Sequence, residues 1–165
     1  MELKLRAVAV VVLAFVASGC GAAAASSSPS SPTASPVVGE GSSGPFHLQL
    51  KLSWPDWHAN EPIPGEATLS IVGIDTLTFG SSSSPILFRF DEVGGDRKFV
   101  EPGAADCRER TLEAGSPLVA PIRFSDPASS LPVGTWRITA SAAVNANGIC
   151  PNGGPVATVE GRVTP

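Results

Sequence analysis

The sequence Phe-His-Leu-Gln-Leu-Lys-Leu-Ser at residues 46–53 decides the fold class. Apolar and polar side chains alternate along it, and successive side chains of a β-strand point to opposite faces of a sheet. One face of this segment is therefore apolar and the other is polar. The pattern predicts a strand that packs one face against a hydrophobic core.

The same alternation returns along the rest of the chain. Segments bounded by Gly, Pro, Ser or Asp are expected as strands at Ala67–Ile71, Leu77–Phe79, Ile86–Val93, Asp96–Val100, Cys107–Leu112, Val119–Phe124, Trp136–Val144 and Val156–Val163. Gly94 and Gly95 predict a hairpin between two of them, because glycine adopts positive φ at little cost. No stretch with a helical period follows residue 44. The serine run at 81–84 is expected as a loop.

These features predict an all-β fold, an antiparallel immunoglobulin-like β-sandwich of about eight or nine strands. The domain is expected at residues 45–165, after a signal peptide and a disordered linker. A jelly roll or a partly closed barrel is the alternative, since the same number of strands permits it. The chain has 165 residues, which suits one domain once the N-terminal segments are set aside.

The N-terminus has the features of a secretory signal at residues 1–19. Lys4 and Arg6 precede an apolar run at residues 7–17, which is shorter than the roughly 20 residues that span a bilayer as a helix. Residues 17–20 read Ala-Ser-Gly-Cys. They resemble the lipobox of bacterial lipoproteins, in which small residues precede a cysteine that is acylated and becomes the new N-terminus.

This resemblance implies lipidation of Cys20 and anchoring to the cell membrane on the extracytoplasmic side. Two acyl chains suffice for stable anchoring. The alternative is an ordinary signal peptide that is cleaved near the alanines at 22–25. Residues 20–44 consist mostly of Ala, Ser, Pro, Thr and Gly, with too little apolar surface to order them, and are expected to form a flexible linker.

Two further segments carry a resemblance. They are Leu112-Glu113-Ala114-Gly115-Ser116-Pro117-Leu118 and Leu131-Pro132-Val133-Gly134-Thr135-Trp136-Arg137-Ile138. A turn before one strand and a Pro-x-Gly-Thr-aromatic entry to a long strand look like bacterial extracellular immunoglobulin-like domains, including the intracellular proteinase inhibitor family. Trp136 stands where those domains usually have tyrosine, so a tyrosine-corner hydrogen bond is excluded there. The resemblance implies inhibition of a peptidase as one function.

The charge balance argues against nucleic acid as a partner. Removing the charged residues of the signal peptide leaves nine Lys and Arg against fourteen Asp and Glu. Proteins that bind nucleic acid need a dense basic surface to neutralise phosphates, and no basic cluster follows Arg6. The chain is mildly acidic.

Cys107 and Cys150 are the only other cysteines of the chain. An exported domain meets oxidising conditions, so one disulfide is expected between them. A redox pair or a pair of metal thiolates is the alternative, although no Cys-x-x-Cys spacing occurs.

The segment Trp54–Glu61 has the most promising side chains for binding. Trp54, Asp56, Trp57 and His58 could form a platform for a sugar or a peptide, because tryptophan offers a broad apolar face with a polar group. Alternatively, tryptophans in such a loop plug the end of a sandwich. The only other histidine, His47, is expected on the polar face of its strand.

No catalytic residues, metal site or cofactor are predicted. Gly-x-Ser-x-Gly does not occur, and the paired carboxylates Asp91 and Glu92 are expected as solvated charge. The leading hypothesis is a non-enzymatic binding or accessory module at the cell surface, with a protein or cell-wall glycan as partner. The alternatives are an inhibitor of an exported peptidase, a cell-wall glycan-acting enzyme that uses Asp56, His58 and Glu61, and a metal-handling protein that uses both histidines.

Overall fold

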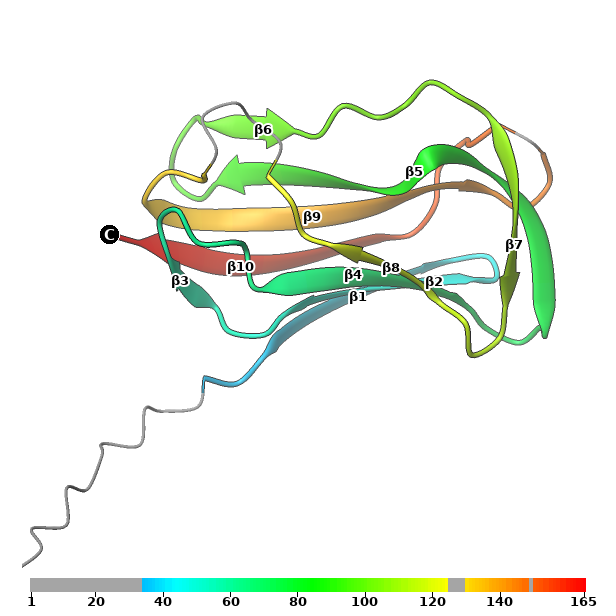
Figure 1. Cartoon of the computed structure of the whole chain (residues 1–165), viewed down its shortest axis with the longest axis horizontal. Coiled ribbons are helices and arrows are strands. Elements are labelled where there is room, and N and C mark those ends of the chain that lie inside the picture. The colour runs from blue at the N-terminus through cyan, green and yellow to red at the C-terminus, as the bar shows by residue number, and fades with distance from the viewer. Residues whose placement is uncertain (1–33, 125–129, 149) are drawn as a thin grey trace, which may run out of the picture. The chain divides into compact units, whose positions relative to one another are not determined.

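The computed structural model describes residues 34–124, 130–148 and 150–165. Within these residues it contains ten strands and no helix (Figure 1). The strands are β1 (Val37–Ser43), β2 (Phe46–Leu52), β3 (Asp56–His58), β4 (Gly65–Ile71), β5 (Thr76–Glu92), β6 (Lys98–Val100), β7 (Arg108–Glu113), β8 (Leu118–Pro121), β9 (Gly134–Asn145) and β10 (Val156–Thr164). The predicted all-β class is confirmed. The expected signal peptide, Cys20 and the linker as far as residue 33 lie outside the described residues.

The strands form two sheets that pack together as a β-sandwich (Figure 1). The four-stranded sheet has the order β1-β2-β4-β8 and is antiparallel throughout. The six-stranded sheet has the order β3-β10-β9-β5-β6, and β7 also pairs with β5. Its one parallel pairing joins β3 to β10. The architecture is therefore the predicted sandwich, with one parallel strand in an otherwise antiparallel arrangement.

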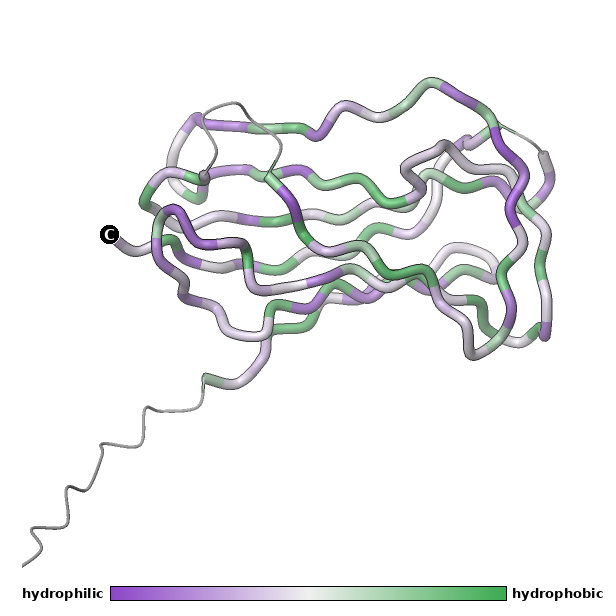
Figure 2. Tube along the Cα trace, viewed as in Figure 1, coloured by the Kyte–Doolittle hydropathy of each residue, from purple (hydrophilic) through white to green (hydrophobic). Residues whose placement is uncertain are grey.

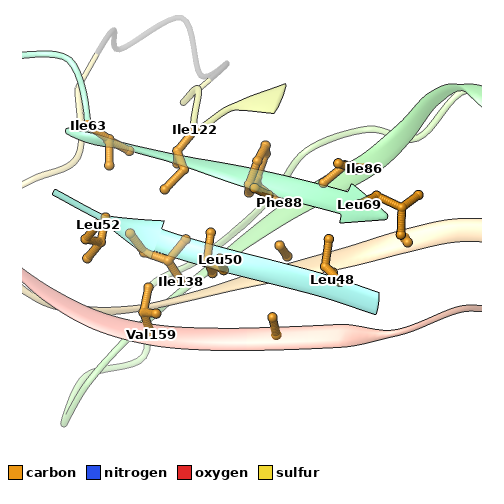
Figure 3. Close-up of a cluster of buried hydrophobic side chains, with 14 of the residues drawn as sticks. Leu48, Leu50, Leu52, Ile63, Leu69, Ile86, Phe88, Ile122, Ile138 and Val159 are labelled. Carbon is orange, nitrogen blue, oxygen red and sulfur yellow. The ribbon is translucent and has the colours of Figure 1, made fainter. Parts of the chain in front are cut away.

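The core lies between the sheets and follows the alternation in the sequence. The β2 side chains Phe46, Leu48, Leu50 and Leu52 are buried, whereas the polar residues between them are not. Figure 3 shows Leu48, Leu50 and Leu52 in the same layer as Ile138 of β9 and Val159 of β10. Hydrophobic and hydrophilic residues alternate along the strands (Figure 2). The period-two pattern thus places the apolar face of each sheet toward the other.

Strand β5 corrects one prediction. The segments around Leu77 and Ile86, expected as separate strands with a serine loop between them, belong to one strand of 17 residues. Its first part pairs with β7 and its second part with β9, and the register shifts between Ser81 and Ile86. Ser81 and Ser82 are buried there. Of the serine run, only Ser81 pairs with both β7 and β9. Ser82 and Ser83 are held instead by side-chain hydrogen bonds, from Ser82 Oγ to the Ser84 carbonyl and from the Ser83 N–H to Asp106, so the segment forms an irregular part of the strand.

Strand β1 differs from the expected linker. Residues 37–43 pair with the whole of β2, although residues 20–44 were predicted to be flexible. Their side chains bury little, but Gly39 and Gly41 lie against the backbone carbonyl groups of Thr158 and Val156 in β10. A Cβ atom at either glycine would overlap the carbonyl oxygen. The strand is therefore ordered by its backbone, which composition does not reveal.

The predicted disulfide is present between Cys107 and Cys150. Their Cα atoms are 4.6 Å apart, and 43 positions separate them in the sequence. In the chain-entropy model, a loop of that length stabilises the fold by roughly 4 kcal/mol. The bond joins the start of β7 to the connection between β9 and β10.

The buried side chain of Trp136 makes a hydrogen bond to the backbone that precedes β9. Its buried indole donates from Nε1 to the carbonyl oxygen of Pro132, four residues earlier, at 2.9 Å. The guanidinium carbon of Arg97 lies 5.3 Å from the ring centroid. Arg97 also pairs with Glu92, and its hydrogen bond lowers the pKa of that carboxyl. The indole thus ties the start of β9 to the preceding connection.

Candidate ligand-binding pocket

The segment that begins at Trp54 follows one edge of the six-stranded sheet. Its residues Asp56–His58 form β3, which pairs with Arg162–Thr164 at the end of β10. Because side chains alternate along a strand, Trp57 faces the core while Asp56 and His58 face solvent.

The expected platform of two tryptophans is not formed. Trp57 is 4 % exposed and belongs to the core, whereas Trp54 is 49 % exposed. The indole of Trp57 lies over Gly161 of β10, where a side chain would collide with it. Trp57 therefore plugs the end of the sandwich, the alternative left open by the sequence, and Trp54 alone offers an accessible ring.

Asp56 is held by an ion pair. Its carboxylate lies 2.9 Å from Nε of Arg162, on the neighbouring strand. Both side chains are at least half exposed, so the pair adds little stability. Asp56 does not line the pocket described below.

His58 is oriented by the backbone. Its Nδ1 donates to the carbonyl oxygen of Pro165 at 2.8 Å and lies 3.1 Å from Oγ1 of Thr164. The backbone N–H of His58 donates to Oε2 of Glu61 at 3.2 Å, and the N–H of Glu61 donates to the His58 carbonyl at 3.1 Å. The imidazole is thus fixed at Nδ1 by the chain that follows β10, and the hydrogen bonds between His58 and Glu61 use the His58 backbone.

His58 and Glu61 contribute to a pocket of about 380 Å³ at this end of the sandwich, here called the end pocket. Its polar lining consists of His58, Asn60, Glu61, Arg123 and Ser130. Its apolar lining consists of Trp57, Pro62, Ile63, Ile122, Phe124 and Leu131. Apolar walls with a few polar groups at the rim are typical of small-molecule and peptide sites.

Two chain segments far apart in sequence meet at the end pocket. Ser130 donates a hydrogen bond from Oγ to Oδ1 of Asn60 at 3.2 Å. Asn60 has a φ of 73°, the only positive φ of a non-glycine residue in the described part of the chain. Asparagine tolerates this conformation better than most residues, so the turn from His58 to Glu61 is stable.

The residues considered for metal binding or acid–base chemistry lie apart or pair with other groups in the described structure. No group of three His, Cys, Asp or Glu side chains lies close enough to hold a metal ion in residues 34–124, 130–148 and 150–165. His47 and His58 belong to different sheets, and Cys107 and Cys150 are joined to each other. Asp91 and Glu92 pair with Arg89 and Arg97 and so serve as ion-pair partners.

Sequence reasoning found one half of the end pocket. It selected the segment up to Glu61 but missed Ile122, Phe124, Ser130 and Leu131, which come from the β8 end and the chain before β9. The segment Val119–Phe124 was predicted as a strand, and nothing in it indicated a ligand site.

Comparison with protein-family models, with curated protein sequences and with solved structures finds no match to this chain. Among the described residues there is no helix long and apolar enough to cross a membrane.

Proposed function

We propose that the chain is an exported lipoprotein, anchored to the cell membrane through Cys20, whose β-sandwich is a non-enzymatic binding module on the extracytoplasmic side. The lipobox-like residues before Cys20 support the anchor. The disulfide between Cys107 and Cys150 supports export, because such bonds persist in oxidising compartments and are rare in the cytosol.

The observation that carries the binding role is the end pocket. Its volume of about 380 Å³ falls in the range of roughly 300–1,000 Å³ that is typical of ligand pockets. The hydrogen bond between Ser130 and Asn60 holds its two walls together without a ligand. A preformed pocket with mixed lining and without paired catalytic groups in the described residues favours binding over turnover.

Site-specific photo-cross-linking tests this role. A photoreactive phenylalanine analogue replaces Pro62, an exposed residue that lines the end pocket, and a control carries it at Glu160, an exposed position on β10. On intact cells, we expect a discrete covalent adduct from position 62 and none from position 160. Mass spectrometry then identifies the adduct as protein or glycan. Equal labelling at both positions, or none at either, would refute a specific site at the end pocket.

The anchor is tested independently. Cys20→Ser removes the thiol that would be acylated. We expect the protein to shift from the membrane fraction to the supernatant, and the acylated N-terminal peptide to be absent from the mass spectrum. If the variant stays membrane-bound, Cys20 is not the anchor. Inhibition of an exported peptidase stays a prediction from the family resemblance alone.

A further inference from the structure

A second hollow, here called the side cleft, lies between β5 and β8. This side cleft has a volume of about 390 Å³ and is bordered by residues 83–86 of β5 and residues 118–121 of β8. Arg123 lines both the side cleft and the end pocket. The two hollows therefore follow one extended segment, residues 118–124, which spans about 20 Å at the rise of a β-strand.

The segment beside these hollows is the edge of a sheet. Among the described residues, β8 ends the four-stranded sheet and pairs with no strand other than β4. Ile122 donates its N–H to the carbonyl of Gly65, so Val119 and Pro121, at the alternate positions, direct their backbone groups away from β4. Val119 then offers both a donor and an acceptor, and Pro121 offers an acceptor. Such an edge can receive an extended peptide.

Arg110 lines the side cleft and forms no ion pair with a carboxylate of the described residues. Five other arginines each pair with a carboxylate, namely Arg89, Arg97, Arg108, Arg137 and Arg162. Arg110 instead donates from Nη2 to the carbonyl of Ser83 at 3.0 Å, and its buried Nε has no hydrogen-bond partner within the described residues. The cleft contains two arginines, Arg110 and Arg123, and one carboxylate, Glu101, in a chain of net charge −4.

The acceptor of Arg110 is itself fixed. The N–H of Ser83 donates to Oδ1 of Asp106 at 2.8 Å, and this bond is the main reason that the pKa of Asp106 falls to about 2. Asp106 also accepts a hydrogen bond from Arg108 and directly precedes Cys107 of the disulfide. The irregular part of β5 is thereby pinned to β7, and Arg110 is positioned at the cleft by rigid elements.

We propose that the side cleft and the end pocket form one groove for an extended peptide, and that a carboxylate of this peptide pairs with Arg110. This inference rests on the proposed binding function and names the class of ligand. Arginine binds carboxylates through parallel hydrogen bonds, which adds both strength and orientation. The excess of one positive charge among the described residues of the side cleft favours an acidic segment of a partner protein over a neutral one.

Fluorescence anisotropy with matched peptides tests the inference on the purified full-length protein. The probe is a labelled, capped Val-Thr-Val-Glu-Val-Thr peptide, whose β-branched residues favour an extended chain. The control peptide has Gln in place of Glu. We expect the Glu peptide to bind about tenfold more tightly, as a charge-assisted hydrogen bond implies. Equal Kd values for the two peptides, or no binding of either, would overturn the inference.

Three variants assign the effect to Arg110. Arg110→Gln should bind the Glu and Gln peptides with equal Kd. Arg110→Lys keeps the charge but loses the planar guanidinium that can form two parallel hydrogen bonds, so it should retain only part of the difference in Kd between the two peptides. Arg89→Gln removes an exposed arginine elsewhere on β5 and should leave the difference unchanged. If Arg110→Gln fails to fold, the ratio of the two Kd values measured with Arg110→Lys decides. An undiminished ratio with Arg110→Lys would refute pairing through the guanidinium.

The two proposals fail separately. Pro62 lines the end pocket but not the side cleft, so its cross-linking result does not depend on Arg110. An adduct at position 62 without a preference for the Glu peptide would support the binding module and refute the acidic ligand.

Discussion

Strands β1 and β2 lie side by side and are held by different forces. β2 buries Phe46, Leu48, Leu50 and Leu52 almost completely, whereas β1 has no fully buried side chain. β1 is ordered by hydrogen bonds to β2 and by the close approach of Gly39 and Gly41 to the carbonyl groups of β10. One strand is fixed by side-chain burial and the other by backbone fit. Only the first kind of strand leaves a periodic pattern in the sequence.

The largest effect is expected from the buried strand. Leu50→Ala removes a side chain with no exposed surface and leaves a cavity between the sheets. We expect a loss of about 3 kcal/mol in the free energy of unfolding, measured by chemical denaturation. The conservative Leu50→Met should cost less than half as much, because it nearly preserves the volume. Equal losses would mean that volume does not determine the stability of β2.

Backbone fit is tested by adding a single methyl group to β1. Gly39→Ala places Cβ against the Thr158 carbonyl, so β1 must move away from β10. We expect a loss of about 2 kcal/mol, comparable to overpacking of a core. Gly44→Ala is not a suitable control, because that glycine has a φ of 56°. Val38→Ala, at an exposed β1 position, should change stability by less than about 0.5 kcal/mol.

The irregular part of β5 extends the comparison, since a carboxylate holds its backbone. The pKa of Asp106 is lowered to about 2, so its contribution to stability is present above the unfolded pKa near 4 and is lost as the pH falls through about 2. We expect Asp106→Asn to be less stable than the native chain at pH 7 and to approach it near pH 2. Unfolding curves over this range test the effect. An unchanged pH dependence would contradict it.

The smallest effect is expected for the exposed cross-strand pair of β1 and β2. Gln49 donates from Nε2 to Oε1 of Glu40 at 2.9 Å on the outer face of the sheet. Glu40→Ala should lower the free energy of unfolding by about 0.5 kcal/mol or less, measured by chemical denaturation, since solvent competes for both groups. A loss as large as that of Gly39→Ala would show that side chains, and not the backbone, hold β1.

The same division explains what could be predicted of the candidate site. His58 and Glu61 were selected because their chemistry is visible in the sequence, but the burial of Trp57 depends on Gly161, which lies more than 100 positions later. Arg110 gave no signal, because its significance comes from the lack of an ion-pair partner among the described residues, which only the structure shows. Both features arise from neighbours that are remote along the chain.

The sequence alone determined the all-β class, the alternation of buried and exposed residues in β2, the hairpin near Gly94 and the partners of the disulfide. These follow from local periodicity, from glycine conformation and from the number of cysteines. The tertiary structure decided that residues 37–43 form a strand, that the serines at 81–84 continue β5, and that residues 118–124 border two hollows. Each depends on backbone contacts between remote segments, which hydropathy and composition do not encode.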